Sequence, residues 1–546
     1  MKKLSLLFFF VHILITSAQN LDSLYNRFLQ VKGVSPHIIN QQNISTQEEP
    51  IKCSFGIVNQ TKLNYEKFTA LQKKTISKLL ERPASDTSFV TPNNKFRIHY
   101  TKTGIDAPGY DLNELAKAVD SSYNYEVNIL RYPPPPKDSG EGGDDLYDIY
   151  IQNLSSDYGY TEFENPITST TYTSFMVIDN DFSGDNYHTH GINGARVTVA
   201  HEMHHGIQIG NYVYRTSDNY YYELTSTSME EFVYNDINDY YYYMDSYFRN
   251  PQRTFSANDG YNLAIWNIFL RDRFGVDIIK RIWELMKGEV ALKAFDDAIA
   301  EAGSTFKVEF NNFGIWTYFT DTRAIPNKYF MEAANYHYLI KPLMVTDFTN
   351  TTSAVNVNSA AVSNNFLQFN DKSNPANNVL VSLISNCDIT GGFSSPITNT
   401  SFAYTLSSKP ISGGQKITNG YYSKLESING FLFSQSNILN DIPVDDGQIS
   451  TEEIDYPFPQ PFKYSANTQL FFPTSNSADG NAELYIYSVD MTLVYSITKR
   501  ILVSDKIVIS WDAHDASGNK LATGVYLFVT KSGDKIKKGK FVIYND

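Results

Sequence analysis

Cysteine is scarce in this 546-residue chain, which contains only Cys53 and Cys387. Two cysteines exclude a small domain built on a network of disulfides, and they leave open whether the pair forms one long-range bridge or stays reduced. The chain also lacks any stretch of about 18 uninterrupted apolar residues, which a membrane-spanning helix would need. Basic residues are the minority, 45 against 59 acidic ones, and the formal net charge is −14. We therefore expect no transmembrane span and no nucleic-acid partner.

The first 18 residues have the composition of a signal peptide. Two lysines at positions 2 and 3 precede an apolar run over residues 4–15, and the small residues Thr16, Ser17 and Ala18 come before Gln19. A positively charged start, a short apolar segment and a small-residue cleavage site are what secretory signals share. The apolar run is too short to cross a bilayer. The sequence therefore predicts export from the cytosol, to the cell surface or the extracellular medium.

The most informative motif is the run HEMHH at residues 201–205. On an α-helix, side chains four positions apart share a face, so His201 and His205 can bind one metal ion. Zinc accepts neutral imidazole nitrogens, and a catalytic site uses three protein ligands so that water takes the fourth position. A carboxylate beside the metal, here Glu202, can take the proton of that water as it attacks a carbonyl. This H-E-x-x-H pattern is typical of zinc-dependent peptidases.

A chance match to this five-residue pattern is the alternative, with odds of roughly one in a hundred for a chain with this many histidines. The surroundings favour the motif. Residues 173–179 have the pattern of a strand, a loop rich in Gly, Asp and His follows, and residues 195–200 enter the motif without a helix breaker. Asn193 is positioned to cap the predicted helix. We therefore expect a metal-binding helix that lines a cleft.

A third ligand should come from another helix, and residues 222–232 are the candidate segment. Glu223 lies 18 residues after His205, and Glu230 lies seven residues further, on the same helical face. This spacing resembles the gluzincin arrangement, in which a glutamate that opens a second helix completes the site and another acidic residue follows two turns later. The resemblance implies that Glu223 is the third ligand and that Glu230 orients a ligating histidine. The two roles could be exchanged.

The resemblance extends along the chain to a little-characterised family of secreted bacterial gluzincin-like metalloproteases, and it covers roughly residues 60–340. One departure lies in the second helix, where Ser226 and Ser228 occupy a stretch that carries a small residue and then tryptophan in that family. The segments that carry the resemblance are residues 96–101, 132–136, 146–151, 174–181, 201–208, 223–231, 261–266 and 273–275.

Three further candidates are weaker. Gluzincins commonly use a tyrosine or histidine to stabilise the oxyanion, and Tyr261 is the candidate here, with a packed helix residue as the alternative. His204 is more readily explained as a solvent-facing or supporting histidine than as a ligand, since one tetrahedral site cannot use it together with His201 and His205. Calcium could bind the Asp-rich loops at residues 144–145 or 179–185 in addition to the expected zinc.

The chain length and changes in composition predict several domains. Residues 19–95 form a helical lead-in, which is either a removable pro-segment or a permanent part of the fold. Residues 96–340 alternate strands and helices, as expected of an α+β zincin-like catalytic domain, with helices at 111–130, 261–270 and 278–286. Residues 341–450 are rich in Ser, Thr and Asn with short alternating apolar runs, which predicts a β-sandwich module.

Residues 451–546 show short strands between Gly and Asn turns. They resemble the Ig-like fold of flagellar hook-capping proteins and the C-terminal sorting domains of type IX secretion substrates. The parts that carry the likeness are the Trp-Asp pair at 511–512, the turn at 517–520, the run at 523–526 and the final strand at 540–543. One departure is Pro-Phe-Pro at 457–459, where the family pattern has Pro-Asn-Pro. The resemblance implies export across the outer membrane by the type IX machinery.

The sequence thus predicts a secreted zinc endopeptidase that acts on a protein or peptide substrate. His201, His205 and Glu223 would bind the metal, and Glu202 would be the general base. The main alternative is a surface adhesin or carbohydrate-binding protein made of β modules around an inactive gluzincin-like domain. A glycosidase that uses paired carboxylates is more remote, because nothing in the sequence selects one pair of acidic residues.

Overall fold

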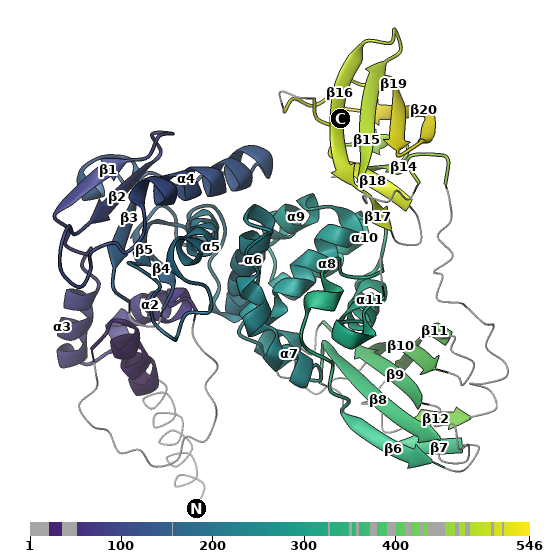
Figure 1. The fold of residues 1–546 in the computed structure, drawn as a ribbon, viewed down its shortest axis with the longest axis horizontal. Coiled ribbons are helices and arrows are strands. Elements are labelled where there is room, and N and C mark those ends of the chain that lie inside the picture. Colours follow the sequence, from purple (N-terminus) through teal and green to yellow (C-terminus); the bar gives the residue numbers. More distant parts are fainter. Residues whose placement is uncertain are drawn as a thin grey trace, which may run out of the picture. The chain divides into compact units, whose positions relative to one another are not determined.

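The structure of the protein, a computed structural model, divides into two compact units, residues 1–242 and 243–546, which are described separately (Figure 1). The boundary falls inside the range expected for one catalytic domain. The two cysteines are both buried and are not joined in a disulfide. The described residues are 21–34, 52–154, 157–325, 328–348, 352–355, 360–371, 379–389, 400–409, 416–424, 431–434, 454–464, 469–475, 481–503, 507–515 and 518–545.

The first unit is built on a mixed five-stranded sheet in the order β1-β2-β3-β5-β4. The parallel strands β2, β3 and β5 form its centre, and β1 and β4 pair antiparallel at the edges. Strands β3 and β5 are almost wholly buried, as expected of parallel strands covered on both faces. The strand bounds are β1 Thr87–Val90, β2 Phe96–Tyr100, β3 Tyr147–Gln152, β4 Gly159–Pro166 and β5 Tyr172–Asp179.

Three long helices accompany the sheet, and the last two carry many buried polar side chains. Helix α4 (Leu112–Tyr123) begins where Asp111 accepts hydrogen bonds from two backbone N–H groups, and it continues into a π-helical turn, η2 (Asn124–Ile129). Helix α5 (Gly191–Asn211) packs against α4, β4 and β5, and α6 (Asn219–Val233) packs against α5. Together, α4 and η2 confirm the predicted helix at 111–130. The short helices η3 (Glu141–Gly143), η4 (Thr216–Asp218) and η5 (Asp239–Tyr243) lie between these elements.

The lead-in segment shares a hydrophobic core with the sheet. It contains α2 (Phe55–Leu63), η1 (Tyr65–Lys67) and α3 (Ala70–Leu79), the last opened by a capping box at Thr69. Side chains of the lead-in, among them Phe28, Val58 and Ile76, pack against Phe175 and Val177 of β5. These residues therefore contribute to the folded core of the first unit.

The second unit opens with helices gathered around aromatic side chains. Trp266 is fully buried and contacts the rings of six phenylalanines, among them Phe255, Phe295 and Phe313. The predicted helices at 261–270 and 278–286 are present. The helices are α7 (Asp245–Arg249), η6 (Phe255–Ala257), η7 (Tyr261–Leu263), α8 (Ala264–Phe274), α9 (Asp277–Leu285), α10 (Ala291–Glu301), α11 (Phe306–Tyr318), η8 (Asp321–Arg323) and η9 (Ala333–Asn335).

After these helices, the regular elements among the described residues are strands, as the change in composition near residue 341 predicts. One sheet has the order β11-β10-β9-β8-β6, and β12 pairs with β7. The bounds are β6 Met344–Phe348, β7 Thr352–Val355, β8 Ser363–Asp371, β9 Val379–Asn386, β10 Thr400–Lys409, β11 Lys416–Lys424 and β12 Phe431–Ser434.

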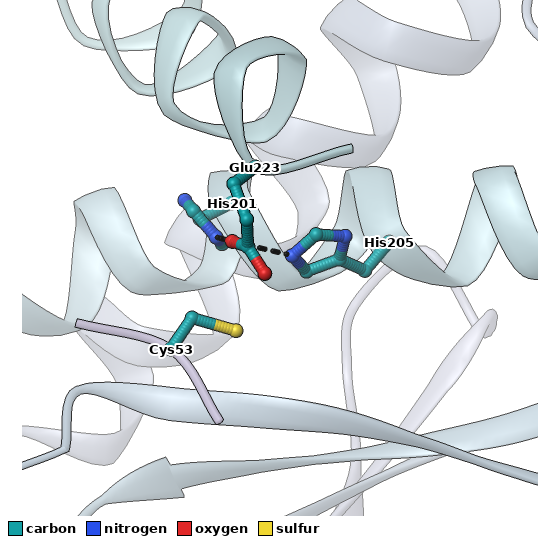
Figure 2. Close-up of side chains that lie close together, drawn as sticks. All are labelled: Cys53, His201, His205 and Glu223. Atoms are coloured by element: carbon teal, nitrogen blue, oxygen red, sulfur yellow. Dashed lines mark hydrogen bonds and ion pairs between the residues drawn. The ribbon is translucent and has the colours of Figure 1, made fainter. Parts of the chain in front are cut away.

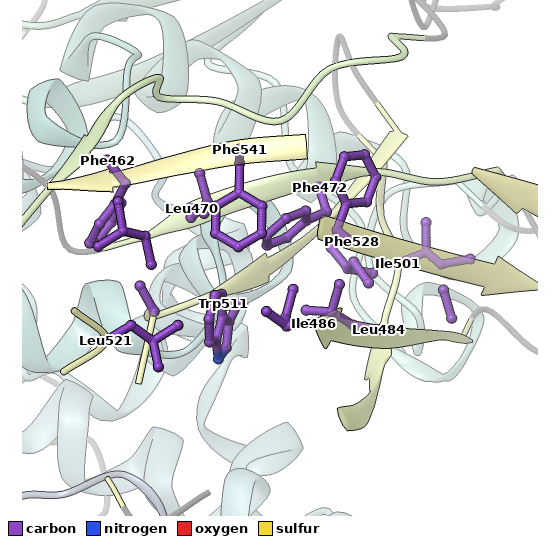
Figure 3. Packing of buried hydrophobic residues seen from close by; sticks show 14 of the residues in the cluster. Phe462, Leu470, Phe472, Leu484, Ile486, Ile501, Trp511, Leu521, Phe528 and Phe541 are labelled. Carbon is purple, nitrogen blue, oxygen red and sulfur yellow. The ribbon is translucent and has the colours of Figure 1, made fainter. Parts of the chain in front are cut away.

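The C-terminal region consists of two sheets that share one core. A five-stranded sheet, β13-β20-β19-β15-β16, contributes Phe528 and Phe541, and a three-stranded sheet, β14-β18-β17, contributes Phe472 and Trp511 (Figure 3). The bounds are β13 Phe462–Lys463, β14 Leu470–Pro473, β15 Asn481–Ser488, β16 Leu493–Arg500, β17 Leu502–Val503, β18 Ile507–Trp511, β19 Gly524–Ser532 and β20 Lys535–Tyr544.

The chain is thus a mixed α/β protein with several sheets. Within the described ranges, no helix is both long enough and apolar enough to cross a membrane. The predicted signal peptide at 1–18 lies outside those ranges.

Candidate metal centre

Helix α5 carries the histidine pair on one face. The rings of His201 and His205 lie with their centroids 4.8 Å apart, and both are buried. The helix begins at Gly191 after His190, so the prediction that Asn193 caps it is wrong. Asn193 lies inside the first turn, where its side-chain oxygen accepts a hydrogen bond from Arg196.

Helix α6 brings Glu223 to the two imidazoles. Its Oε2 lies 3.2 Å from Nε2 of His201 and 3.3 Å from Nε2 of His205. Bonds of about 2.0–2.1 Å in a tetrahedral zinc site place neighbouring ligand atoms about 3.3–3.4 Å apart. The two distances from Glu223 match this spacing, and Figure 2 shows the three side chains turned toward one another.

The outer nitrogen of each imidazole has its own hydrogen-bond partner. Nδ1 of His201 lies 2.8 Å from Oε1 of Glu230, and Nδ1 of His205 lies 2.8 Å from Oε1 of Gln208 and 3.2 Å from Oγ of Ser226. An acceptor at Nδ1 favours the tautomer that leaves the Nε2 lone pair for a metal. Glu230 therefore contacts His201, one of the two histidines that the sequence predicts to bind a metal.

The charges of this cluster favour a cation at its centre. Burial lowers the pKa of His201, but hydrogen bonds with Glu223 and Glu230 outweigh burial and raise it to about 9. Burial raises the pKa of Glu223, but the charge of His205 and the hydrogen bonds from both histidines lower it to about 2. A carboxylate held this firmly ionised between two imidazoles attracts one positive charge, which a proton or a divalent metal ion can supply.

Glu202, which follows His201 in α5, contacts the edge strand β4 with its side chain. Its Oε2 accepts a hydrogen bond of 2.8 Å from Oγ1 of Thr161. Burial raises the pKa of Glu202, while the neighbouring His205 and His201 oppose that rise. A carboxyl group of raised pKa beside a metal is suited to take up a proton during catalysis.

A fourth side chain, which the sequence did not single out, completes the cluster. Cys53 comes from the chain just before α2, and its sulfur lies with the ligand atoms of His201, His205 and Glu223 within 4.8 Å of one another (Figure 2). The Cys53 thiol is also a hydrogen-bonding partner of Glu202. Thiolate is a common zinc ligand, so all four residues have donor types that zinc accepts.

The residue before Cys53 is a buried lysine. Nζ of Lys52 lies 2.5 Å from Oε2 of Glu230 and also binds Asp239, whose other oxygen accepts a hydrogen bond from Tyr158. Burial lowers the pKa of Lys52, but the charges of Asp239 and Glu230 raise it further than burial lowers it. Lys52 therefore neutralises the carboxylate that orients His201.

Two further candidates from the sequence, His204 and Tyr261, are both buried. His204 is fully buried, so a solvent-facing position is wrong; its Nδ1 lies 2.8 Å from Oε2 of Glu126, and burial raises the pKa of Glu126. Tyr261 belongs to the second unit, where it is buried and its ring lies 5.7 Å from that of Tyr243. Its part in catalysis stays a prediction.

The Asp-rich loops bind partners within the protein. Asp144 pairs with Arg97, and Asp179 accepts hydrogen bonds from the backbone N–H groups of Asp181 and Phe182. Within the described part of the chain, the cluster at Cys53 is the one place where three or more such donors gather. Calcium binding at these loops stays a prediction.

Comparison with known families gives one match. Residues 101–314 match a family of unknown function (DUF6055). The matched range covers less than half of the chain; it contains His201, His205 and Glu223, and Cys53 lies ahead of it. No curated protein matches the chain.

Two solved structures from Porphyromonas gingivalis show a slight likeness. PorZ, described as an essential bacterial surface component of the type-IX secretion system, is 13% identical over 34% of this chain and 39% of its own, with a TM-score of 0.14. Dimeric latent PorU is 15% identical over 34% of this chain and 20% of its own, with a TM-score of 0.13. The chain spans less than two thirds of either protein, and TM-scores at this level do not indicate a shared fold.

The close approach of α5 to β4 depends on a glycine. A Cβ at Gly159 would lie 2.7 Å from the carbonyl oxygen of Val177 and 2.8 Å from Cγ2 of Thr198. Gly159→Ala is therefore expected to destabilise the first unit by about 1–3 kcal/mol through overpacking. Urea denaturation followed by far-UV circular dichroism would measure the change. Gly184→Ala is the matched control, because its Cβ would meet nothing closer than 3.7 Å; equal midpoints for the two variants would contradict the expectation.

Proposed function

We propose that this protein is a secreted zinc endopeptidase with His201, His205 and Glu223 as metal ligands. The observation that carries the proposal is the convergence of two Nε2 atoms and one carboxylate oxygen at 3.2 and 3.3 Å, with each Nδ1 atom bound on its outer side. Together with Glu202 beside the cluster, this donor set fits the zincin-like domain that the sequence predicts. When bound, zinc supplies Lewis-acid polarisation of a carbonyl group and of water.

The protein's own residues would manage the protons. Glu202 would take one proton from water as the water oxygen attacks the scissile carbonyl carbon, and it would then pass that proton to the departing amine nitrogen. The hydrogen bond from Thr161 keeps one carboxylate oxygen in place during this exchange. Glu230 would hold His201 in the tautomer that presents Nε2 to the metal.

The C-terminal region would serve export. The proposal is supported by the likeness of residues 451–546 to type IX sorting domains, by the signal-peptide composition of residues 1–18 and by the two packed sheets around Trp511 and Phe541. An Ig-like sorting domain recognised by the type IX machinery would place the peptidase at the cell surface or in the medium.

Metal analysis and peptide cleavage on the full chain test the enzymatic proposal. We expect one zinc ion per chain, cleavage within a broad peptide library, loss of that cleavage with a chelator and its return with added zinc. The assay should include both the wild-type chain and Cys53→Ala, because Cys53 lies in the cluster.

A chain that binds no zinc would overturn the proposal. Zinc binding without cleavage by either chain would favour the adhesin or carbohydrate-binding alternative, in which the metal only stabilises the fold.

A further inference from the structure

Cys53 makes the cluster a set of four protein ligands. Zinc in a catalytic site keeps one of its four positions for water, whereas a set of four protein donors closes the tetrahedron. Cys53 is 4% exposed and its sulfur is within 4.8 Å of the other three donor atoms. With a thiolate at this position, the proposed catalytic water has no place on the metal.

The backbone around Cys53 is held against the start of β4 by an isolated parallel bridge. The N–H of Tyr158 donates to the carbonyl of Lys52 at 2.9 Å, the N–H of Ser54 donates to the carbonyl of Gly159 at 3.3 Å, and Cys53 pairs with Gly159 in a parallel bridge. The neighbouring side chains add two contacts. Lys52 forms its buried ion pairs, and the ring of Phe55 stacks on His205 with centroids 3.9 Å apart.

Helix α2 covers the next part of the same edge. Nδ2 of Asn59 donates to the carbonyl of Thr161 at 3.0 Å, and the N–H of Phe163 donates to Oδ1 of Asn59 at 3.1 Å. Among the described strands, β4 is one edge of the first unit's sheet. An extended peptide that binds a sheet edge uses these backbone groups, so residues 52–63 occupy the place that such a peptide would take.

We propose that residues 52–63 are an inhibitory latch on the metal centre, with the Cys53 thiolate as fourth ligand and α2 over the β4 edge. This inference rests on the proposed zinc site. It adds how the site is regulated, and it names an extended peptide as the substrate. Opening breaks the metal–sulfur bond, the thiolate takes up one proton, and one water molecule enters the position that sulfur leaves. No oxidant or reductant is needed for this step.

Cobalt substitution of the full chain tests the ligand. Cobalt(II) takes the place of zinc in such sites, and a cobalt–thiolate bond gives a near-ultraviolet charge-transfer absorption that nitrogen and oxygen ligands do not give. We expect this band in the wild-type chain and in Cys387→Ala, and its absence in Cys53→Ala and Cys53→Ser. Cys387→Ala is the matched control, because Cys387 is also buried but lies in the second unit.

Peptide cleavage tests the regulation. A chain that is open only part of the time shows only that fraction of its full activity, so we expect Cys53→Ala to cleave at least about tenfold faster than wild type. Cys53→Ser keeps the size of the side chain, and we expect it to cleave as fast as Cys53→Ala. Agreement between the two variants would show that the change in rate comes from loss of the sulfur ligand and not from poor folding.

Each outcome bears on one proposal or on both. Metal bound without the sulfur band in wild type, or equal cleavage by wild type and Cys53→Ala, would overturn the latch and leave the peptidase proposal standing. Loss of metal from Cys53→Ala and Cys53→Ser, with both still folded, would show a permanent structural site and overturn both proposals. No metal in any chain would overturn the peptidase proposal and remove the basis of the latch.

Discussion

Glu202→Gln is expected to retain zinc and to lose at least about 10²-fold in the rate of peptide cleavage, because general-base assistance contributes that much or more. The substitution keeps the shape of the side chain and an oxygen that can accept the hydrogen bond from Thr161. It removes the ability to take a proton from water. Since Glu202 is not among the clustered donor atoms, metal affinity should change little.

The measurement is best made in a chain that also carries Cys53→Ala, so that the latch does not mask the rate. Zinc content and cleavage of one peptide are compared with and without Glu202→Gln. Glu126→Gln is the matched control, since Glu126 is a fully buried carboxyl that contacts the other side of α5 at His204. A loss of less than tenfold in rate, or a parallel loss of zinc, would contradict the role of Glu202.

Lys52→Met is expected to destabilise the first unit by about 3–5 kcal/mol, the range found when one partner of a buried ion pair is removed. Methionine fills a similar volume but leaves the buried Glu230 and Asp239 side chains without their common cation. Burial raises the pKa of Asp239, but the charge and hydrogen bond of Lys52, together with hydrogen bonds from Thr189 and Tyr158, lower it further, so the net shift is downward from 3.8. The stabilisation from this pair is therefore present above pH 3.8 and is lost as the pH falls below that value.

Hydrogen exchange of the α6 amides at neutral pH would measure this change within the first unit. All four tryptophans lie in residues 243–546, so tryptophan fluorescence follows the second unit and provides an internal control. Lys117→Met is the matched variant, because Lys117 pairs with Glu114 at an exposed site, where an ion pair contributes little to stability. Equal protection in Lys52→Met and wild type would refute the expectation.

Local sequence patterns were sufficient for the helix elements of the candidate site. Spacing within one helix brings His201 and His205 to the same face, and a second helix carries Glu223 and Glu230 one above the other. These relations depend on the 3.6-residue period alone, so they can be read without tertiary information. The helix at 111–130 was predictable for the same reason, and the strand at 173–179 was predictable from its short continuous apolar run.

The contribution of Cys53 and Lys52 could not be predicted. Their positions follow from pairing between residues 52–54 and the start of β4, a contact between segments far apart in the sequence that leaves no local pattern. The same holds for Ser226, whose contact with His205 depends on how α6 packs on α5.

The buried ion pairs of Lys52 give the latch an electrostatic consequence. Lys52 is adjacent to Cys53, so a movement that withdraws the sulfur also withdraws the ammonium group from Glu230 and Asp239. Glu230 would then share its negative charge with the Nδ1–H of His201 alone, which makes that imidazole a stronger electron donor. Release of the N-terminal segment would thus strengthen the remaining bond from His201 to the ion while uncovering the ion to solvent.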